Sequence, residues 1–175
     1  MIISVKKAKS LISFPEIWTD EKVEMKLKAV EQTIRAYTNN NFQDRDYRRT
    51  ADIVGGLFMV EALTPFDIGD TLQISESRLN KGLFTVETAD DSTFTVKETV
   101  KDENDVLVTK IVYPADVIDC CVNLMEWEVN NRGKVGIKSE TLSRHSVTYE
   151  DSASMFMGYP ASLLGCLKPY RKARC

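Results

Sequence analysis

The sequence predicts an α+β fold: a small helical bundle, made of two long antiparallel helices plus short terminal helices, with an inserted small antiparallel β-barrel-like domain. Two stretches with helical spacing, 20–38 and 114–131, predict the long helices, and short alternating runs between them predict the barrel. Because the helical spacing resumes after the strands, we expect a discontinuous helical connector domain, 1–50 and 113–175, and an inserted β-domain, 51–112.

The second long helix is predicted by YPADVIDCCVNLMEWEVNNR, residues 113–132. Its apolar residues recur at three- and four-residue steps and so share one helical face: Val117, Cys120, Cys121, Leu124 and Trp127. Pro114 suits the first turn, where no N–H partner is needed, and Gly133 suits the left-handed position after the last turn. A second helix must cover the apolar face.

The first long helix is predicted at 20–38. Thr19 is a capping residue, and Asp20 and Glu21 place negative charge at the positive end of the helix dipole. Its apolar residues step by four, three, four and three: Val23, Leu27, Val30, Ile34 and Tyr37. We expect one buried interface between the two helices, formed by Leu27, Val30, Ile34, Leu124 and Trp127.

Between the helices the apolar residues alternate at period two, in about five short runs separated by turn residues. The alternation predicts these inward positions: Phe58, Val60, Leu72, Ile74, Phe84, Val86, Phe94 and Val96. Such strands suit a small barrel or a curled sheet, since closure hides strand edges. We expect residues 43–49 to be a linker into this domain and Tyr113-Pro114 the return.

Shorter elements are expected at both ends of the chain. Residues 5–14 predict a short helical turn that Pro15 interrupts, and Pro160 is expected to start a short helix that Pro169 ends. The polar stretch after Gly133 has no helical period. A loose hairpin that pairs Ile137, Leu142, Val147 and Tyr149 is one interpretation of it.

The composition, 43% hydrophobic and 28% charged over 175 residues, is typical of a folded protein. A formal charge of −3 gives no overall signal for nucleic acid or membrane binding, and no apolar run approaches the length of a membrane span. The first residues lack the pattern of a signal peptide. We expect free thiols in a reducing cytosol, and we expect that Cys120 and Cys121, as helix neighbours, cannot both point inward.

No stretch predicts catalysis, a metal site or a cofactor. Ser143 stands near the only histidine, His145, but an extended segment gives this pair no orienting third group, and an exposed loop is the favoured interpretation. Gly55-Gly56 lacks the lysine of a phosphate-binding loop. The acidic runs at Asp90-Asp91 and 103–105 lack the spacing of a calcium loop, so solvated turns are favoured there.

Two stretches are candidate contact surfaces. The basic end, residues 168–175, suits an acidic partner or nucleic acid, and composition alone favours a frayed terminus instead. The polar stretch 134–149 is long for a structureless connection, so binding and disorder are both open.

The chain resembles the head–tail connectors, the adaptor or head-completion proteins of long-tailed bacteriophages and prophages. The resemblance is carried by YPADVIDCCVNLMEWEVNNR, by the following VGIKSETLSRHSVTYED and by the ending GYPASLLGCLKPYRKAR, which together with the first helix make up about two-thirds of the chain. Within the strands, IGDTLQIS and NKGLFTVE are similar to the β insertion of larger members.

The resemblance implies a structural virion protein, made in the bacterial host cytoplasm and placed at the head–tail junction. Such proteins form a homo-oligomeric ring, usually a dodecamer, between the portal protein of the filled head and the stopper or tail-completion protein. DNA only passes through the channel, and no enzyme activity, cofactor or membrane is involved. The implied portal-docking residues are Lys168, Tyr170, Arg171, Lys172 and Arg174, and the implied subunit-contact arm includes Lys138, Glu140, Arg144, His145 and Tyr149.

The alternative is a stand-alone binding module whose small barrel recognises an oligonucleotide or a peptide. Barrels of that kind use exposed aromatic residues and a basic groove. Here Phe58, Phe66, Phe84 and Phe94 mostly occupy inward positions, and acidic residues outnumber basic ones in the strands. Both observations weigh against this alternative.

Overall fold

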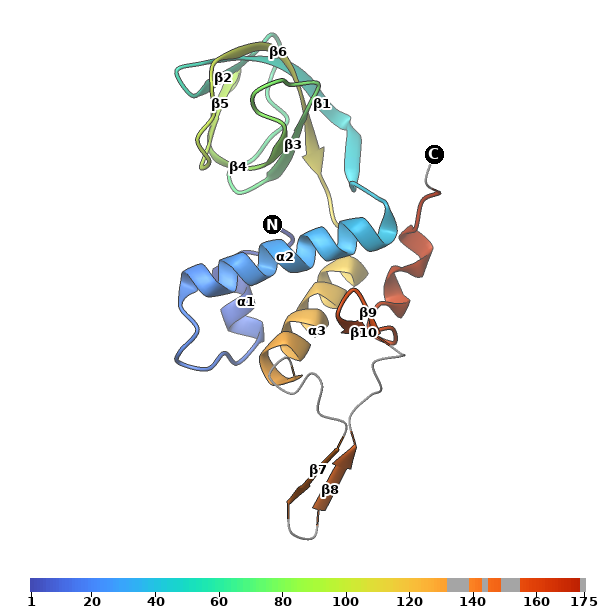
Figure 1. Cartoon of the computed structure of the whole chain (residues 1–175). Helices are drawn as coiled ribbons and strands as arrows, with labels where there is room; N and C mark the ends of the chain where they lie inside the picture. The colour runs from blue at the N-terminus through green and yellow to red at the C-terminus, as the bar shows by residue number, and fades with distance from the viewer. Residues whose placement is uncertain (132–138, 143–144, 149–154, 174–175) are drawn as a thin grey trace. The chain divides into compact units, whose positions relative to one another are not determined.

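The computed structural model describes residues 1–131, 139–142, 145–148 and 155–173. The chain divides into two compact units (Figure 1). One unit consists of Met1–Asn40 and Pro114–Cys175, and we call it the two-segment unit. The other is Asn41–Tyr113, which we call the barrel.

The fold class predicted from the sequence is wrong. The structure is a mixed α/β protein with a closed six-stranded antiparallel barrel, and its described residues contain four helices: α1 (Val5–Leu11), α2 (Asp20–Thr38), α3 (Ala115–Asn131) and the 3₁₀-helix η3 (Gly165–Tyr170). Only α2 and α3 are long, and the elements packed against them are short: α1 contacts α2, and η3 contacts both α2 and α3. With these four helices beside a closed six-stranded barrel, the described chain is a mixed α/β protein and not a helical bundle with an inserted barrel.

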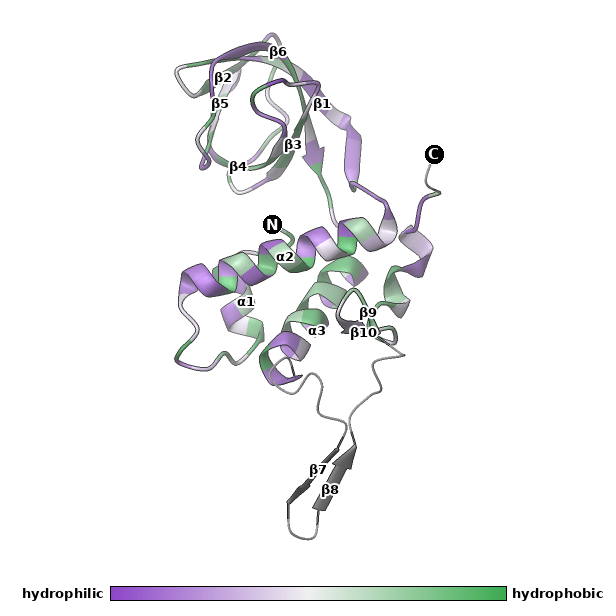
Figure 2. Ribbon diagram, viewed as in Figure 1, coloured by the Kyte–Doolittle hydropathy of each residue, from purple (hydrophilic) through white to green (hydrophobic). Residues whose placement is uncertain are grey.

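Helix α2 begins and ends where the sequence predicts. The Thr19 hydroxyl accepts the Lys22 backbone N–H at 3.3 Å, which satisfies one of the donors left free in the first turn. Asn39 takes a left-handed conformation with φ 48° and closes the last turn. Along α2 and α3, hydrophobic and hydrophilic residues alternate at helical spacing (Figure 2).

The two long helices bury most of the predicted interface. Leu27, Val30, Ile34 and Leu124 are buried, whereas Trp127 is only half-buried and its ring lies 5.4 Å from that of Tyr159. The expectation that Cys120 and Cys121 cannot both point inward is wrong, because both are fully buried. Helix α3 is covered on more than one side: the Cys120 thiol donates to the Leu163 carbonyl, and burial together with the charge of Glu31 on α2 raises the pKa of the Cys121 thiol.

The barrel contains six strands in the order β1-β2-β5-β4-β3-β6, with β6 pairing back to β1. Their bounds are β1 (Gln43–Val54), β2 (Leu57–Val60), β3 (Thr71–Ser75), β4 (Gly82–Ala89), β5 (Thr93–Val96) and β6 (Glu103–Ile111). All neighbouring strands are antiparallel. Gly55 and Gly56, with φ 59° and 84°, make the two-residue turn between β1 and β2.

Aromatic and β-branched side chains fill the barrel. All eight predicted inward residues are buried, from Phe58 to Val96. The Phe58 and Phe94 rings stack with centroids 4.5 Å apart, and Phe66 meets Phe94 edge-on at 5.2 Å. The core cluster draws only on residues 51–108, so the barrel has a hydrophobic core of its own.

The predicted linker at 43–49 is wrong, because these residues form the first half of β1. Arg48, Arg49 and Thr50 pair with Thr109, Val108 and Leu107 of β6, after an irregularity that follows Gln43. This part of β1 cannot be predicted from its charged sequence, because its partner strand lies about 60 residues away and the bulge interrupts the alternation of side chains along the strand. The barrel ends meet: the Val112 N–H donates to the Phe42 carbonyl at 3.0 Å, and the Phe42 and Tyr113 rings are 5.0 Å apart.

The remaining strands are short. β7 (Ser139–Leu142) and β8 (His145–Thr148) form a two-stranded antiparallel sheet in which Leu142 pairs with His145 and Glu140 with Val147. β9 (Met155–Phe156) pairs with β10 (Tyr159–Pro160). The helix expected from Pro160 to Pro169 is wrong: Pro160 ends β10, a turn follows, and Pro169 lies inside η3. Proline is tolerated there because η3 is a single short 3₁₀ segment.

Candidate docking surfaces

Hydrogen bonds from both the backbone and the side chains at the end of α2 hold the backbone of the C-terminal segment. The Lys172 N–H donates to the Thr38 carbonyl at 2.8 Å. The side-chain amides of Asn39 and Asn40 donate to the carbonyls of Ala173, at 2.9 Å, and Tyr170, at 3.2 Å. The expectation of a frayed terminus is therefore wrong as far as Ala173, because carbonyls of the C-terminal segment accept hydrogen bonds from asparagine side chains at the end of α2.

Asn39 and Asn40 are residues whose role the sequence analysis missed. The run of asparagines at residues 39–41 predicts only the end of α2, and Asn39 and Asn40 do lie there. An asparagine amide also carries two N–H donors, and these reach a segment about 130 residues away. No local sequence pattern predicts such a contact.

Tyr170 and Arg171 are held against the same unit. The Tyr170 hydroxyl lies 2.7 and 2.8 Å from the two carboxylate oxygens of Asp116, and this hydrogen bond raises the pKa of Tyr170. The Arg171 guanidinium lies 5.3 Å from the centre of the Tyr37 ring, a cation–π distance. Tyr170 therefore anchors the segment within the chain, which reduces its value as an anchor for a partner.

The cationic groups of this segment remain on the surface. Lys168, Arg171 and Lys172 are exposed, and Arg174 lies outside the described residues. We call Lys168, Arg171 and Lys172 the cationic segment. Since the backbone is fixed, these side chains are presented from a preorganised position.

The residues of the implied subunit-contact arm are only partly described. Glu140 lies in β7 and His145 in β8, and these two strands pair with each other. Lys138, Arg144 and Tyr149 lie outside the described residues. Of the described strands, none other than β7 and β8 joins this sheet, so each has an outer edge without a described strand partner.

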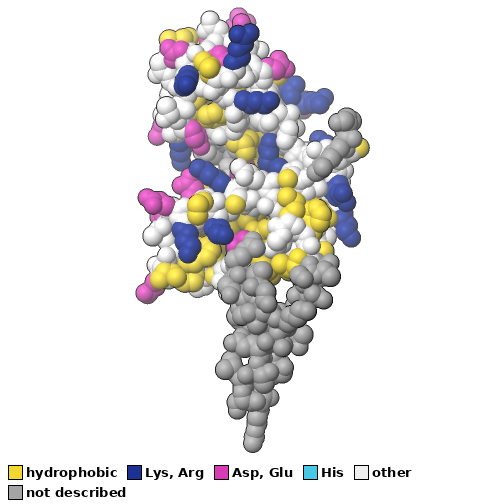
Figure 3. Space-filling model, viewed as in Figure 1, with side chains coloured by type: hydrophobic (Ala, Val, Ile, Leu, Met, Phe, Trp, Pro, Cys, Tyr) yellow, Lys and Arg dark blue, Asp and Glu magenta, His cyan; other side chains and the backbone are white. Residues whose placement is uncertain are grey.

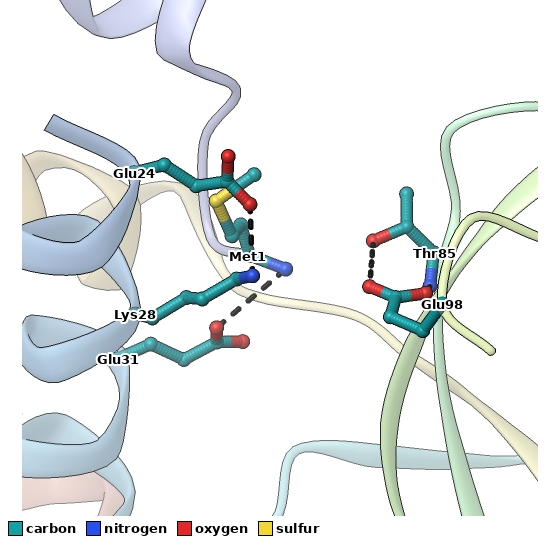
Figure 4. A network of polar contacts seen from close by, with 6 residues as sticks. All are labelled: Met1, Glu24, Lys28, Glu31, Thr85 and Glu98. Atoms are coloured by element: carbon teal, nitrogen blue, oxygen red, sulfur yellow. Dashed lines mark hydrogen bonds and ion pairs between the residues drawn. The ribbon is translucent and has the colours of Figure 1, made fainter. Parts of the chain in front are cut away.

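Two buried carboxylates stabilise the two-segment unit. Glu128 on α3 accepts the Tyr159 hydroxyl at 2.7 Å and pairs with the Lys26 ammonium on α2 at 3.1 Å. Glu31 on α2 lies 3.5 Å from the ammonium of Met1, next to the Glu24–Lys28 pair at 2.8 Å (Figure 4). These carboxylates have charged or hydroxyl partners, and they fix elements of the unit to one another.

Two of the thiols, Cys120 and Cys166, lie near one carbonyl. The Cys120 and Cys166 sulfurs are 3.4 and 3.5 Å from the Leu163 oxygen, with Cys120 buried and Cys166 exposed. Burial raises the pKa of Cys120, and it raises the pKa of Cys121 to about 12. Within the described part of the chain, no group of three or more metal-binding side chains gathers.

Acidic groups dominate the barrel, where residues 41–113 hold fourteen Asp and Glu against eight Lys and Arg. Several carboxylates fix loops: Glu103 accepts from the Ser77 hydroxyl at 2.6 Å and the Arg78 N–H at 2.6 Å, and Glu98 accepts from Thr85 (Figure 4). Lys110, in turn, pairs with Asp70 at 2.6 Å. A barrel that is net acidic, with its phenylalanines inside, does not suit the phosphate backbone of an oligonucleotide.

Comparison with known protein families finds no family model that matches this chain, and comparison with curated proteins finds no match. In the part of the chain that the structure describes, no helix has both the length and the apolar character that crossing a membrane requires.

Proposed function

We propose that this chain is a phage head–tail adaptor, a structural virion protein that forms a ring between the portal and the stopper or tail and leaves a channel for DNA. The proposal begins from the resemblance of the second long helix, the stretch after it and the C-terminal segment to such connectors. In this role the protein acts by binding partners, not by catalysis.

The observation that carries the proposal is the cationic segment. Lys168, Arg171 and Lys172 are exposed on a backbone that hydrogen bonds fix to the end of α2. A preorganised set of cations loses little conformational entropy when it pairs with carboxylates on another protein. This supports the segment as the portal-docking surface and the portal as an acidic partner there.

The sheet of β7 and β8 supports the contact between subunits. A two-stranded antiparallel sheet is only marginally stable by itself, and its outer edges can accept a further strand. In a ring, a neighbouring subunit supplies that partner. The arm residues Glu140 and His145 lie in these strands.

The test measures retention on portal-bearing heads. The double substitution Lys168→Glu and Lys172→Glu leaves the backbone bonds in place and reverses two exposed charges, so we expect at least a tenfold loss of retention, which corresponds to about 1.4 kcal/mol. Added salt should weaken the wild-type contact. The matched control, Lys81→Glu with Lys97→Glu, reverses two exposed charges of the barrel and should be retained like wild type. Equal retention of both double variants would exclude the cationic segment from docking.

A further inference from the structure

Two cysteine side chains from different elements of the two-segment unit meet at one carbonyl. Cys120 belongs to α3 and Cys166 to η3, and these two helices pack against each other. The Cys120 sulfur lies 3.4 Å from the Leu163 oxygen, and the Cys166 sulfur lies 3.5 Å from the same atom. A carbonyl oxygen has two lone pairs and can accept from both thiols. The fold therefore brings together two thiols that are far apart in the sequence.

The two thiols also interact with each other. Burial raises the pKa of Cys120, and a hydrogen bond with the Cys166 thiol raises it further. Both cysteines are free in this structure. A disulfide requires that two cysteine side chains already point toward each other, because its geometry is narrowly fixed. Cys120 and Cys166 meet this first requirement in the folded protein.

Solvent reaches only one thiol of this pair. Hydrophobic side chains, which share one colour with the cysteines in Figure 3, lie partly on the surface of the two-segment unit, so residue type alone does not show which thiol is accessible. Cys166 is exposed, whereas Cys120 has no exposed surface. A dissolved reagent therefore meets Cys166 first, and Cys120 can react only with a sulfur that lies beside it.

Cys121, although adjacent to Cys120 in the sequence, has different surroundings. Successive residues of an α-helix are turned by about 100° from each other. Burial and the charge of Glu31 on α2 raise the pKa of Cys121 to about 12, so this thiol lies near α2. Cys121 is as fully buried as Cys120. It therefore provides a comparison within the same helix, a buried thiol that lies near a different element.

We propose that Cys120 and Cys166 are a modification site at which a small disulfide, such as glutathione disulfide, oxidises the pair to an intramolecular disulfide. In the first step the Cys166 thiolate attacks one sulfur of glutathione disulfide, which forms a mixed disulfide and releases one glutathione thiolate. In the second step Cys120 gives up its proton and attacks the Cys166 sulfur, which forms the new bond and releases the second glutathione. The two protein thiols lose two electrons and two protons, and glutathione disulfide becomes two molecules of glutathione.

The second step is intramolecular, and this decides which buried thiol reacts. The raised pKa of Cys120 keeps its thiolate scarce, which slows the attack. The high effective concentration of a neighbouring group offsets this, because the Cys166 sulfur is already beside Cys120.

The new bond joins α3 covalently to η3, the helix that carries Lys168 of the cationic segment. In a reducing solution the thiols stay free, and the bond forms when the protein meets an oxidising one. The inference goes beyond the proposed function and does not depend on it.

Incubation of the native protein with glutathione disulfide, followed by trypsin digestion and mass spectrometry without reductant, tests the pair. All samples carry Cys175→Ser, which removes the thiol outside the described residues. The parent chain should yield the peptide 111–132 linked to the peptide that contains Cys166. Trypsin leaves Cys120 and Cys121 together in the first peptide, because residues 111–131 contain no lysine or arginine. Cys121→Ala should therefore keep the linked peptide, whereas Cys120→Ala should lose it and stop at the mixed disulfide of Cys166.

Two controls keep the test sharp. Circular dichroism should show both variants folded, and fragmentation of the linked peptide from the parent chain should assign the bond to Cys120 without any variant. In urea the preference should vanish, because an unfolded chain brings Cys120 and Cys121 to Cys166 equally often. A native parent chain that stops at the mixed disulfide, or a bond that fragmentation assigns to Cys121, would overturn the inference. Neither result involves the portal, so the inference and the proposed function can fail separately.

Discussion

The carboxylate of Glu103, at the start of β6, holds the loop between β3 and β4. Hydrogen bonds from the Ser77 hydroxyl and the Arg78 N–H, with further ones from Leu79 and Asn80, lower the pKa of Glu103 to about 2 from 4.5. A lowered folded-state pKa means that the carboxylate stabilises the barrel above about pH 4.5, and that this contribution is lost as the pH falls toward 2.

Glu103→Gln should therefore lower the melting temperature at pH 7 and flatten its fall between pH 5 and pH 2. Thermal unfolding followed across this pH range measures both effects. Glu87→Gln, at an exposed position of β4, serves as the control. Identical pH profiles for the wild type and Glu103→Gln would show that this carboxylate does not hold the loop.

The thiols should differ sharply in reactivity. Cys120 and Cys121 are buried with raised pKa values, so little thiolate exists at neutral pH, whereas Cys166 is exposed. Brief treatment of the native protein with iodoacetamide should label Cys166, and Cys120 and Cys121 only after denaturation. Peptide mass spectrometry reads the sites, and labelling of Cys121 as fast as Cys166 would contradict the buried arrangement.

The packing of α2 against α3 determines how much stability is lost when a buried side chain between them is truncated. Leu124 is fully buried, so Leu124→Ala should destabilise the protein by about 2–5 kcal/mol through lost burial and the cavity left behind. Glu126→Ala, on the exposed side of α3, should change stability by less than about 0.5 kcal/mol. Urea denaturation compares the two, and equal effects would argue against the interface.

Local signals account for what the sequence predicts correctly. The cap at Thr19 and the spacing from Val23 to Ile34 fix α2 to its observed bounds, and alternation identifies the buried residues of the barrel. Prediction from the sequence fails where a segment is held by a partner that is distant in the chain. The first half of β1 is a strand because β6 pairs with it, and the C-terminal segment is ordered because Asn39 and Asn40 bind its carbonyls.

The same reason explains the error in fold class. Helical spacing reveals an apolar face but not what covers it, and here the cover on α2 and α3 includes the 3₁₀-helix η3. Composition identifies the basic residues of the C-terminal segment but favours a frayed terminus for them. The hydrogen bonds that fix the backbone of this segment to the end of α2 are visible only in the structure.

At the scale of the molecule, the barrel should fold alone. Its hydrophobic cluster uses only barrel residues, and its ends are joined by the bond between Phe42 and Val112. Residues 41–113 expressed separately should give a β-type circular dichroism spectrum and a cooperative unfolding transition. A fragment without such a transition would show that the barrel depends on the two-segment unit.

We propose that this chain forms a ring on the portal, and electron microscopy of portal-bearing heads incubated with the purified protein tests this proposal. We expect a closed ring of additional density on the portal, absent when Lys168→Glu and Lys172→Glu are introduced and present with Lys81→Glu and Lys97→Glu. Heads that show no added density at saturating wild-type protein would contradict it.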